Sequence, residues 1–356
     1  MIEHVFTYNW YLKDGYPASG IEKNNLKVFS CFACGGGSTM GYKLAGYDVL
    51  GCNEIDKRMI DVYIENHYPK YAYNEPIQIF KNRIDLPEEL YNLDILDGSP
   101  PCSSFSIAGN RDKDWGKEKY FREGQEKQVL DTLFFDFIDL AKKLQPKVII
   151  AENVKGLLIG EAKKYVQKIH HSLNNAGYYS AHWLLDASVM GVPQKRERVF
   201  FISIRKDIAD KLNENIFTLS EFPYINIDFN ENEIIFNTVE NLINDKKLIN
   251  IKEELTELYK NYWNESKSGE PVGKFNTYKK IYKDKVITTL PSSNNLYHYS
   301  ECRELSDLEL KLCSSFPLDY NFIDQSVNYI CGMSVPPIMT AQIALRIKKY
   351  WFDKIK

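Results

Sequence analysis

The chain has 356 residues, of which 44% are hydrophobic and 26% are charged, and its formal net charge is −3. These fractions are ordinary for a globular protein, and the length allows one large domain and a smaller second one. The near-neutral balance excludes a strongly basic chain, so any surface for nucleic acid must be local. We find no run apolar enough to span a bilayer and no secretory signal, so the seven cysteines are expected to be reduced, in a cytoplasm.

Strands and helices are predicted to alternate between residues 26 and 205, after a tyrosine-rich extension over residues 1–25. The expected strands lie at 26–31, 47–52, 76–80, 93–96, 148–151, 182–187 and 199–204. The expected helices lie at 39–45, 57–67, 129–144 and 161–175. This alternation predicts an α/β fold with a doubly wound, mostly parallel sheet that carries helices on both faces.

The pattern changes after residue 205. From 206 to 320, Asn, Glu and Lys become frequent and only short β-like pieces such as 286–290 remain, which predicts a smaller irregular domain. An amphipathic helix is expected over 334–352, opened by Pro336 and Pro337.

A glycine-rich turn follows the first strand. Gly35, Gly36 and Gly37 let the backbone approach a ligand, but they do not form G-x-G-x-x-G, so a dinucleotide is poorly supported. Glu54 ends the second strand, where an acid can accept hydrogen bonds from ribose hydroxyls, and Phe32 can stack on adenine. Together they favour an adenosine-containing ligand without a diphosphate, such as S-adenosylmethionine. The alternative is a plain tight turn.

Pro100, Pro101 and Cys102 follow the fourth strand, and the prolines stiffen the backbone before the thiol. A cysteine at the carboxyl end of a parallel strand is well placed for a nucleophile, although a buried structural cysteine is the alternative. Glu152 ends the neighbouring strand and would face the same crevice, unless it merely caps a helix. No metal site is expected, because the one C-x-x-C pair has no second ligand pair.

Arg196 and Arg198 lie on the same side of an extended segment. We expect their guanidinium groups to face a phosphate or a base carbonyl, with a solvated charged strand as the alternative.

Seven stretches in this order closely resemble the motifs of DNA cytosine-5 methyltransferases: residues 32–37, 53–56, 101–106, 152–154, 194–198, 303–317 and 332–337. The resemblance covers most of the chain outside residues 1–25 and the stretch from about 206 to 300. It implies that residues 26–205 bind the cofactor and catalyse, and that 206–320 recognise the target. It also implies that 321–356 pack back on the first domain.

The resemblance implies S-adenosyl-L-methionine as cofactor and S-adenosyl-L-homocysteine as its product. The residues expected to bind the cofactor are Phe32, Gly35, Gly36, Gly37, Glu54, Ile55, Asp85, Pro101, Ser334 and Val335. Asn82 is an alternative to Asp85 for the contact with adenine. This chain has Ser30, Cys34 and Met333 where the family usually has Asp, Gly and Asn, and the last change removes an amide from the cofactor pocket.

In the implied mechanism, Cys102 attacks carbon 6 of a cytosine flipped out of duplex DNA, and carbon 5 then accepts the methyl group. Glu152 holds the ring nitrogen beside the exocyclic amine, Arg198 contacts the carbonyl oxygen of the base, and Arg196 helps to position it. Residues 107–128 are expected to close over the base. In residues 274–283, basic side chains alternate with aromatic ones. We expect this segment to lie along the DNA backbone and contact its phosphates.

We expect a monomer that acts on double-stranded DNA in a bacterial cytoplasm or nucleoid, without a membrane and with a possible cognate restriction endonuclease. One alternative keeps the chemistry but takes transfer RNA as substrate; the long polar stretch up to residue 320 favours DNA. The other is a catalytically silent DNA-binding relative, against which the retained Cys102, Glu152 and Arg198 argue.

Overall fold

The computed structural model describes residues 4–101, 132–160, 162–214, 220–243, 255–273, 278–292 and 296–355. Cys102, the expected loop over 107–128 and residues 274–277 of the expected phosphate-tracking segment lie outside the described residues.

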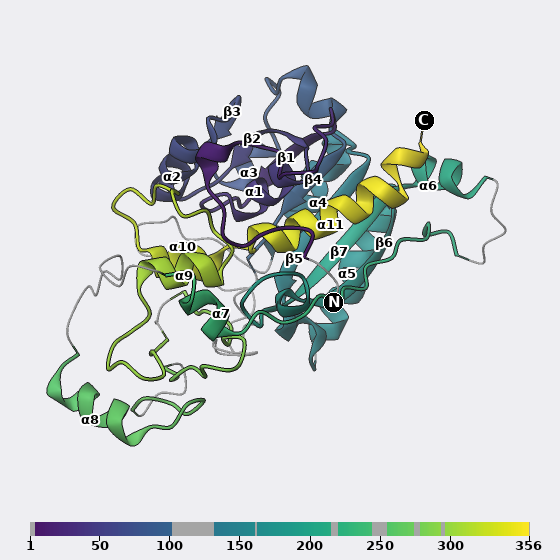
Figure 1. Ribbon diagram of the computed structural model, residues 1–356. Helices are drawn as coiled ribbons and strands as arrows, with labels where there is room; N and C mark the ends of the chain where they lie inside the picture. Colours follow the sequence, from purple (N-terminus) through teal and green to yellow (C-terminus); the bar gives the residue numbers. More distant parts are fainter. Residues whose placement is uncertain are drawn as a thin grey trace.

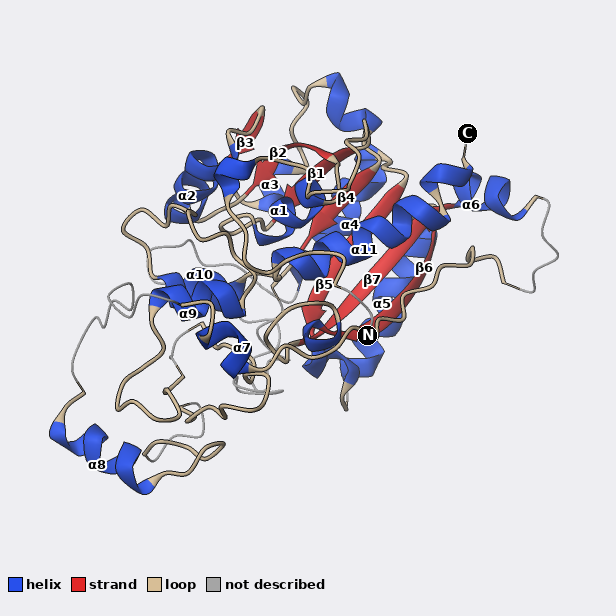
Figure 2. Cartoon of the chain, in the orientation of Figure 1, coloured by secondary structure: helices blue, strands red, loops and turns tan. Residues whose placement is uncertain are grey.

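Seven strands form one sheet in the order β3-β2-β1-β4-β5-β7-β6 within the described part of the chain (Figures 1 and 2). They are β1 (Lys27–Cys31), β2 (Asp48–Asn53), β3 (Tyr71–Tyr73), β4 (Ile95–Gly98), β5 (Val148–Val154), β6 (Tyr178–Asp186) and β7 (Glu197–Arg205). Strands β1 to β5 pair in parallel, whereas β7 runs antiparallel to both β5 and β6. The mostly parallel sheet is therefore confirmed.

Helices cover both faces of this sheet. Neighbouring strand residues point to opposite faces, so they pack in two separate hydrophobic clusters. Val28 of β1 packs in the cluster that contains side chains of α1 (Gly37–Leu44), α2 (Lys57–His67) and α11 (Pro337–Tyr350). Phe29, the next residue, packs in the cluster with α3 (Ile77–Phe80), α4 (Leu133–Leu144) and α5 (Ala162–Asn175). Figure 1 shows α11 lying along the first of these faces. The doubly wound arrangement is as predicted.

The strand expected over 76–80 is wrong. Those residues form the short helix α3, which begins after Pro76, and the third strand is β3, a few residues earlier. Ile77 and Phe80 are buried while Ile79 is 55% exposed, a spacing that fits one helical turn against the sheet. Tertiary packing of two side chains three residues apart decided the conformation of this ambiguous apolar run.

Beyond β7 the described residues contain helices and isolated bridges but no further strand. The helices are α6 (Lys206–Asn213), α7 (Phe236–Glu240), α8 (Glu257–Glu265), α9 (Asp307–Cys313) and α10 (Val327–Met333). Short 3-10 turns lie at Leu12–Asp14, Glu88–Asn92, Lys155–Leu158, Ala187–Val189 and Phe352–Lys354. The β-like piece expected near 286–290 forms a single bridge, between Ile287 and Gln194.

The C-terminal helical stretch Val327–Lys354 has the length and apolar composition of a membrane span, which the sequence-based prediction of no such run missed. However, 83% of its most apolar window is buried inside the protein. It is therefore packed as a core element, with α11 against α1 and the sheet.

The N-terminal extension packs against the C-terminal part of the chain. Trp10 is buried and its indole Nε1 donates to the carbonyl of Ser315 at 2.9 Å. The amides of Leu12 and Lys13 donate to the two carboxylate oxygens of Asp319, at 2.6 and 3.0 Å. Residues 4–25 thus brace the segment that leads to the cavity described next.

Candidate active site

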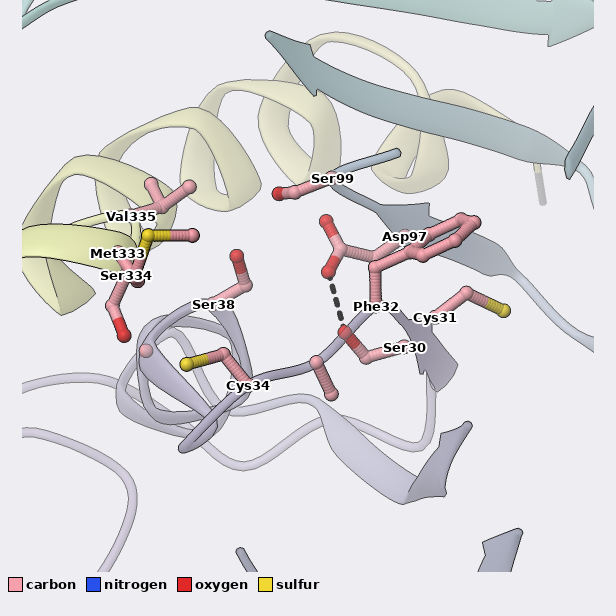
Figure 3. Close-up of a pocket in the computed structure, with 12 residues that line it drawn as sticks. Ser30, Cys31, Phe32, Cys34, Ser38, Asp97, Ser99, Met333, Ser334 and Val335 are labelled. Carbon is pink, nitrogen blue, oxygen red and sulfur yellow. Dashed lines mark hydrogen bonds between the residues drawn. The ribbon is translucent and has the colours of Figure 1, made fainter. Parts of the chain in front are cut away.

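A cavity opens at the carboxyl ends of β1 and β4, where ligands of open α/β sheets bind (Figure 3). It holds about 280 Å³ of empty space, including its open mouth. Twelve described residues line it: Ser30, Cys31, Phe32, Ala33, Cys34, Gly37, Ser38, Asp97, Ser99, Met333, Ser334 and Val335. Three segments distant in sequence therefore build one pocket.

The glycine turn needs its glycines. Gly36 has φ +86°, and a Cβ atom there would lie 2.2 Å from Nε2 of His67. A Cβ on Gly37 would lie 2.4 Å from the carbonyl oxygen of Val335, on the opposite wall of the cavity. Burial lowers the pKa of His67 to about 3, so the ring under the turn is neutral. Close approach of the backbone to His67 and Val335 shapes this wall.

Gly35 joins this turn to the C-terminal segment. Its carbonyl oxygen accepts hydrogen bonds from the hydroxyl of Tyr320 and from Nε2 of His67, the latter at 3.2 Å. Tyr320 follows the stretch that the N-terminal extension braces.

Glu54 holds the turn through its carboxylate. Its two oxygens accept the backbone amides of Cys34, at 2.8 Å, and of Asp56, at 2.9 Å. Burial raises the pKa of Glu54. Cys34 has φ +46°, a left-handed conformation in which glycine is favoured. The hydrogen bond from its backbone amide to Glu54 helps to keep the residue in this conformation. Glu54 and Ile55 stand beside the pocket but are not among its lining residues.

The far wall of the cavity comes from the end of α10 and the residues after it. Met333, Ser334 and Val335 all line it, and the expected cofactor contacts of Ser334 and Val335 stay predictions. The thioether of Met333 occupies this wall where the family usually has an amide.

Asp85 lies apart from the cavity. Its side chain is 62% exposed and its carboxylate pairs with Arg83. Asn82, the alternative, donates its side-chain amide to the carbonyl of Gln78. Neither residue lines the pocket, so the adenine contact stays a prediction.

Glu152 and Arg198 form an ion pair. Nε of Arg198 lies 3.0 Å from Oε1 of Glu152, and the two side chains are only 15% and 13% exposed. The antiparallel register sets Val154 opposite Arg198, so the two groups converge near the end of β5. Burial lowers the pKa of Arg198, although the carboxylate of Glu152 works against this shift.

Arg196 is turned into the protein. Its guanidinium donates to the carbonyls of Leu290, at 3.3 Å, and Gly332, at 2.8 Å, and its Nε has no partner among the described residues. Burial lowers its pKa well below the usual value. Its described contacts therefore tie the segment near residue 290 to the cavity wall, and they are made to the chain itself.

Asn153 anchors the segment that leads to the expected nucleophile. Its side-chain amide donates to the carbonyl of Pro100 at 3.1 Å, and it is buried. Ser99 lines the cavity three positions before Cys102, and Pro101 is half-buried at the edge of the described residues. The approach to Cys102 is thus fixed between the cavity and β5.

Sequence reasoning missed Asp97 altogether. It is the penultimate residue of β4, lines the cavity, is 5% exposed, and accepts hydrogen bonds from Ser30 and Tyr42. Burial raises its pKa to about 7. The signal available in the sequence was an acid within an otherwise apolar strand. Within the described residues, no group of three or more His, Cys, Asp or Glu side chains gathers as metal ligands.

Comparison with known proteins places these motifs in one family. The model of the C-5 cytosine-specific DNA methylases matches residues 26–349. Type II methyltransferase M.FnuDI of Fusobacterium nucleatum is 36% identical over 199 residues, which are 56% of this chain and 51% of that protein. Type II methyltransferase M.NgoFVII of Neisseria gonorrhoeae is 25% identical over 351 residues, 93% of this chain and 88% of that one.

The fold has a solved counterpart in a putative DNA modification methyltransferase encoded within a prophage of E. coli. The TM-score is 0.64 at 19% identity, covering 92% of this chain and 99% of that one. This chain spans about half the length of M.FnuDI. Since the family model extends over most of the chain, the protein belongs to the C-5 cytosine-specific DNA methylases.

Proposed function

We propose that this protein transfers a methyl group from S-adenosyl-L-methionine to carbon 5 of a cytosine in double-stranded DNA, within a short specific site. The observation that carries the proposal is the partly buried pair of Glu152 and Arg198, which meets at the carboxyl end of β5. An acid and a guanidinium in this place can together bind the edge of a pyrimidine.

The side chains that line the cavity suit the methyl donor that this family uses. Ser334 presents a buried hydroxyl that has no partner among the described residues. The ring of Phe32 suits an adenine, and Asp97 suits a positive charge. When bound, the donor would supply an electrophilic methyl group, with Phe32, Gly35, Gly36, Gly37, Glu54, Ile55, Pro101, Ser334 and Val335 as the proposed contacts.

Catalysis begins with Cys102, whose thiolate attacks carbon 6 of the flipped cytosine and makes carbon 5 nucleophilic. Glu152 shares a proton with the ring nitrogen as charge builds there, and Arg198 binds the carbonyl oxygen of the base. Arg196 acts as a positioning residue, because its hydrogen bonds hold the strand that carries Arg198. After methyl transfer, a base removes the proton on carbon 5 and Cys102 leaves by elimination.

Residues 206–320 are proposed to read the DNA sequence. In the basic and aromatic segment, Lys280 is buried, lies 3.5 Å from the ring centroid of Trp263, and donates to the carbonyls of Trp263 and Ser266. Lys280 therefore serves this region's own packing, whereas Lys283 and Lys285 are exposed and available for phosphates. We further propose a monomer in the bacterial cytoplasm or nucleoid, beside a cognate restriction endonuclease.

The test is methyl transfer from labelled S-adenosylmethionine to duplex DNA or to transfer RNA. We expect label in DNA alone, and bisulfite sequencing of DNA from expressing cells should reveal the site. The variant Cys102→Ala should still bind DNA and cofactor but transfer no methyl group. Label only in transfer RNA would replace the substrate, and transfer by the variant at the wild-type rate would end the covalent mechanism.

A further inference from the structure

The cavity contains one carboxylate and no matching cation. Asp97 is the single carboxylic acid among the twelve described lining residues, and none of them is a lysine or an arginine. At 5% exposure its charge has little water around it. A buried carboxylate without a cationic partner is costly, which indicates that a ligand completes this site.

Two hydroxyls fix the orientation of this group. Oγ of Ser30 donates to Oδ2 of Asp97 at 2.7 Å, and the hydroxyl of Tyr42 donates to Oδ1 at 3.0 Å. Each carboxylate oxygen can still accept one further hydrogen bond. Figure 3 shows the carboxylate directed into the space bounded by Ser38 and Ser99. The group is therefore preorganised toward the cavity.

We propose that Asp97 binds the α-ammonium group of the cofactor, as its counter-charge in the pocket. This rests on the proposed function, since it requires S-adenosylmethionine in this cavity. The cofactor has two positive centres, an ammonium and a sulfonium. The ammonium is the one that can donate N–H hydrogen bonds, which the remaining acceptor positions of Asp97 require.

The position of this acid explains one departure from the family. Ser30 stands where the family usually has an aspartate, and Ser30 and Asp97 are direct partners in the parallel pairing of β1 with β4. Their side chains meet on the same face of the sheet. In this chain the carboxylate of the pair therefore comes from β4, and the hydroxyl of the pair comes from β1.

Several titratable groups face Asp97 from the elements around it. On β5, the carboxylate of Glu152 adds to the rise in the pKa of Asp97. Burial raises the pKa values of Cys31 on β1, Tyr42 on α1 and Tyr63 on α2 well above their usual ranges, so these groups stay neutral. Glu54, which directly follows β2, also has a raised pKa, so a variant at position 97 is needed to assign the titration.

Cofactor affinity should depend on pH. With a pKa of about 7, Asp97 is neutral in more acidic solution and ionised in more basic solution, and binding of a cation favours the ionised form. Affinity should therefore rise about tenfold from pH 6 to pH 8 and then level off. At pH 7, binding should release about half a proton.

The experiment is titration calorimetry on the full chain, with S-adenosylhomocysteine and S-adenosylmethionine as separate probes, in buffers of different ionisation enthalpy. The variant Asp97→Asn should bind both probes at least tenfold more weakly at pH 8, without the pH dependence or the proton release. The control is Asp94→Asn, because Asp94 is a buried acid that pairs with Lys147 outside the cavity. This variant should keep the pH dependence and the proton release of the wild-type chain.

Two further variants keep the proposal testable if Asp97→Asn folds poorly. Ser30→Ala removes a donor that favours the ionised acid, so the midpoint of the pH profile should move upward. The double variant Ser30→Asp with Asp97→Ser should bind more tightly than Asp97→Ser alone, because the charge returns from the adjacent strand.

Wild-type affinity and proton release in Asp97→Asn would overturn the proposal. Weakening with S-adenosylmethionine alone would overturn the assignment to the ammonium, because S-adenosylhomocysteine keeps that group but lacks the sulfonium. If the wild-type chain binds neither probe, the proposed function fails as well. If it binds and methylates while Asp97→Asn is unaffected, only this inference fails.

Discussion

Replacing Glu152 with glutamine separates chemistry from stability. The amide keeps an oxygen that can accept from Arg198, but it carries no charge and cannot share a proton in the same way. The wild-type pair lies 3.0 Å apart, with both side chains at 15% exposure or less. The change therefore alters the protonation chemistry with little change in shape.

The cost in stability should be modest. Deleting one member of a buried ion pair costs about 3 to 5 kcal/mol, but glutamine retains the hydrogen bond in its neutral form. We expect a loss of about 2 kcal/mol, which lowers the melting temperature by about 3 °C in a protein of this size. The loss of proton transfer should slow the methyl-transfer step by about 10²- to 10⁴-fold.

Single-turnover transfer of labelled methyl groups to duplex DNA measures the rate, and thermal unfolding measures the stability. The matched control is Glu197→Gln, because Glu197 lies on β7 next to Arg198 and pairs with Lys155, with the two side chains 34% and 40% exposed. That variant should lose less than about 1 kcal/mol and keep its rate. If Glu152→Gln transfers methyl groups at the wild-type rate, Glu152 takes no part in the chemistry.

Three more variants test the cavity and the N-terminal extension. Gly37→Ala should cost about 1 to 3 kcal/mol and weaken S-adenosylhomocysteine binding in calorimetry, since its methyl group would meet the carbonyl of Val335 at 2.4 Å; unchanged affinity contradicts the close approach. Trp10→Ala should lower the free energy of unfolding, measured with denaturant, by about 3 to 5 kcal/mol, because Trp10 is 7% exposed and hydrogen-bonded to the carbonyl of Ser315. A loss below about 1 kcal/mol would contradict the bracing role of the N-terminal extension. Met333→Asn should tighten cofactor binding several-fold by calorimetry, and weaker binding would show that the thioether contributes to this pocket.

Much of the fold was predictable because it depends on local patterns. The alternation of apolar strands with amphipathic segments predicted the α/β sheet, and the predicted glycine turn follows β1 and contributes Gly37 to the cavity. The strand predicted at 76–80 was wrong because a five-residue stretch with three large apolar side chains fits either a strand or a helical turn. Only the packing of Ile77 and Phe80 against the sheet selected the helix.

The arginine motif shows where spacing stops being informative. The two-residue periodicity of a strand predicts that Arg196 and Arg198 share a face, but it does not predict which groups cover that face. The partners of Arg196 lie 94 and 136 residues away in the chain, at Leu290 and Gly332. These carbonyls engage the guanidinium of Arg196, while Arg198 pairs with Glu152.

The sequence alone determined the family's motifs, their order and the strand ends that carry them, because these are properties of neighbouring residues. The tertiary structure decided which charges meet. Asp97 and Ser30 are 67 residues apart, yet the pairing of β1 with β4 joins their side chains in one cavity. The energy of a buried charge depends on the groups around it, and a folded chain draws those groups from distant segments.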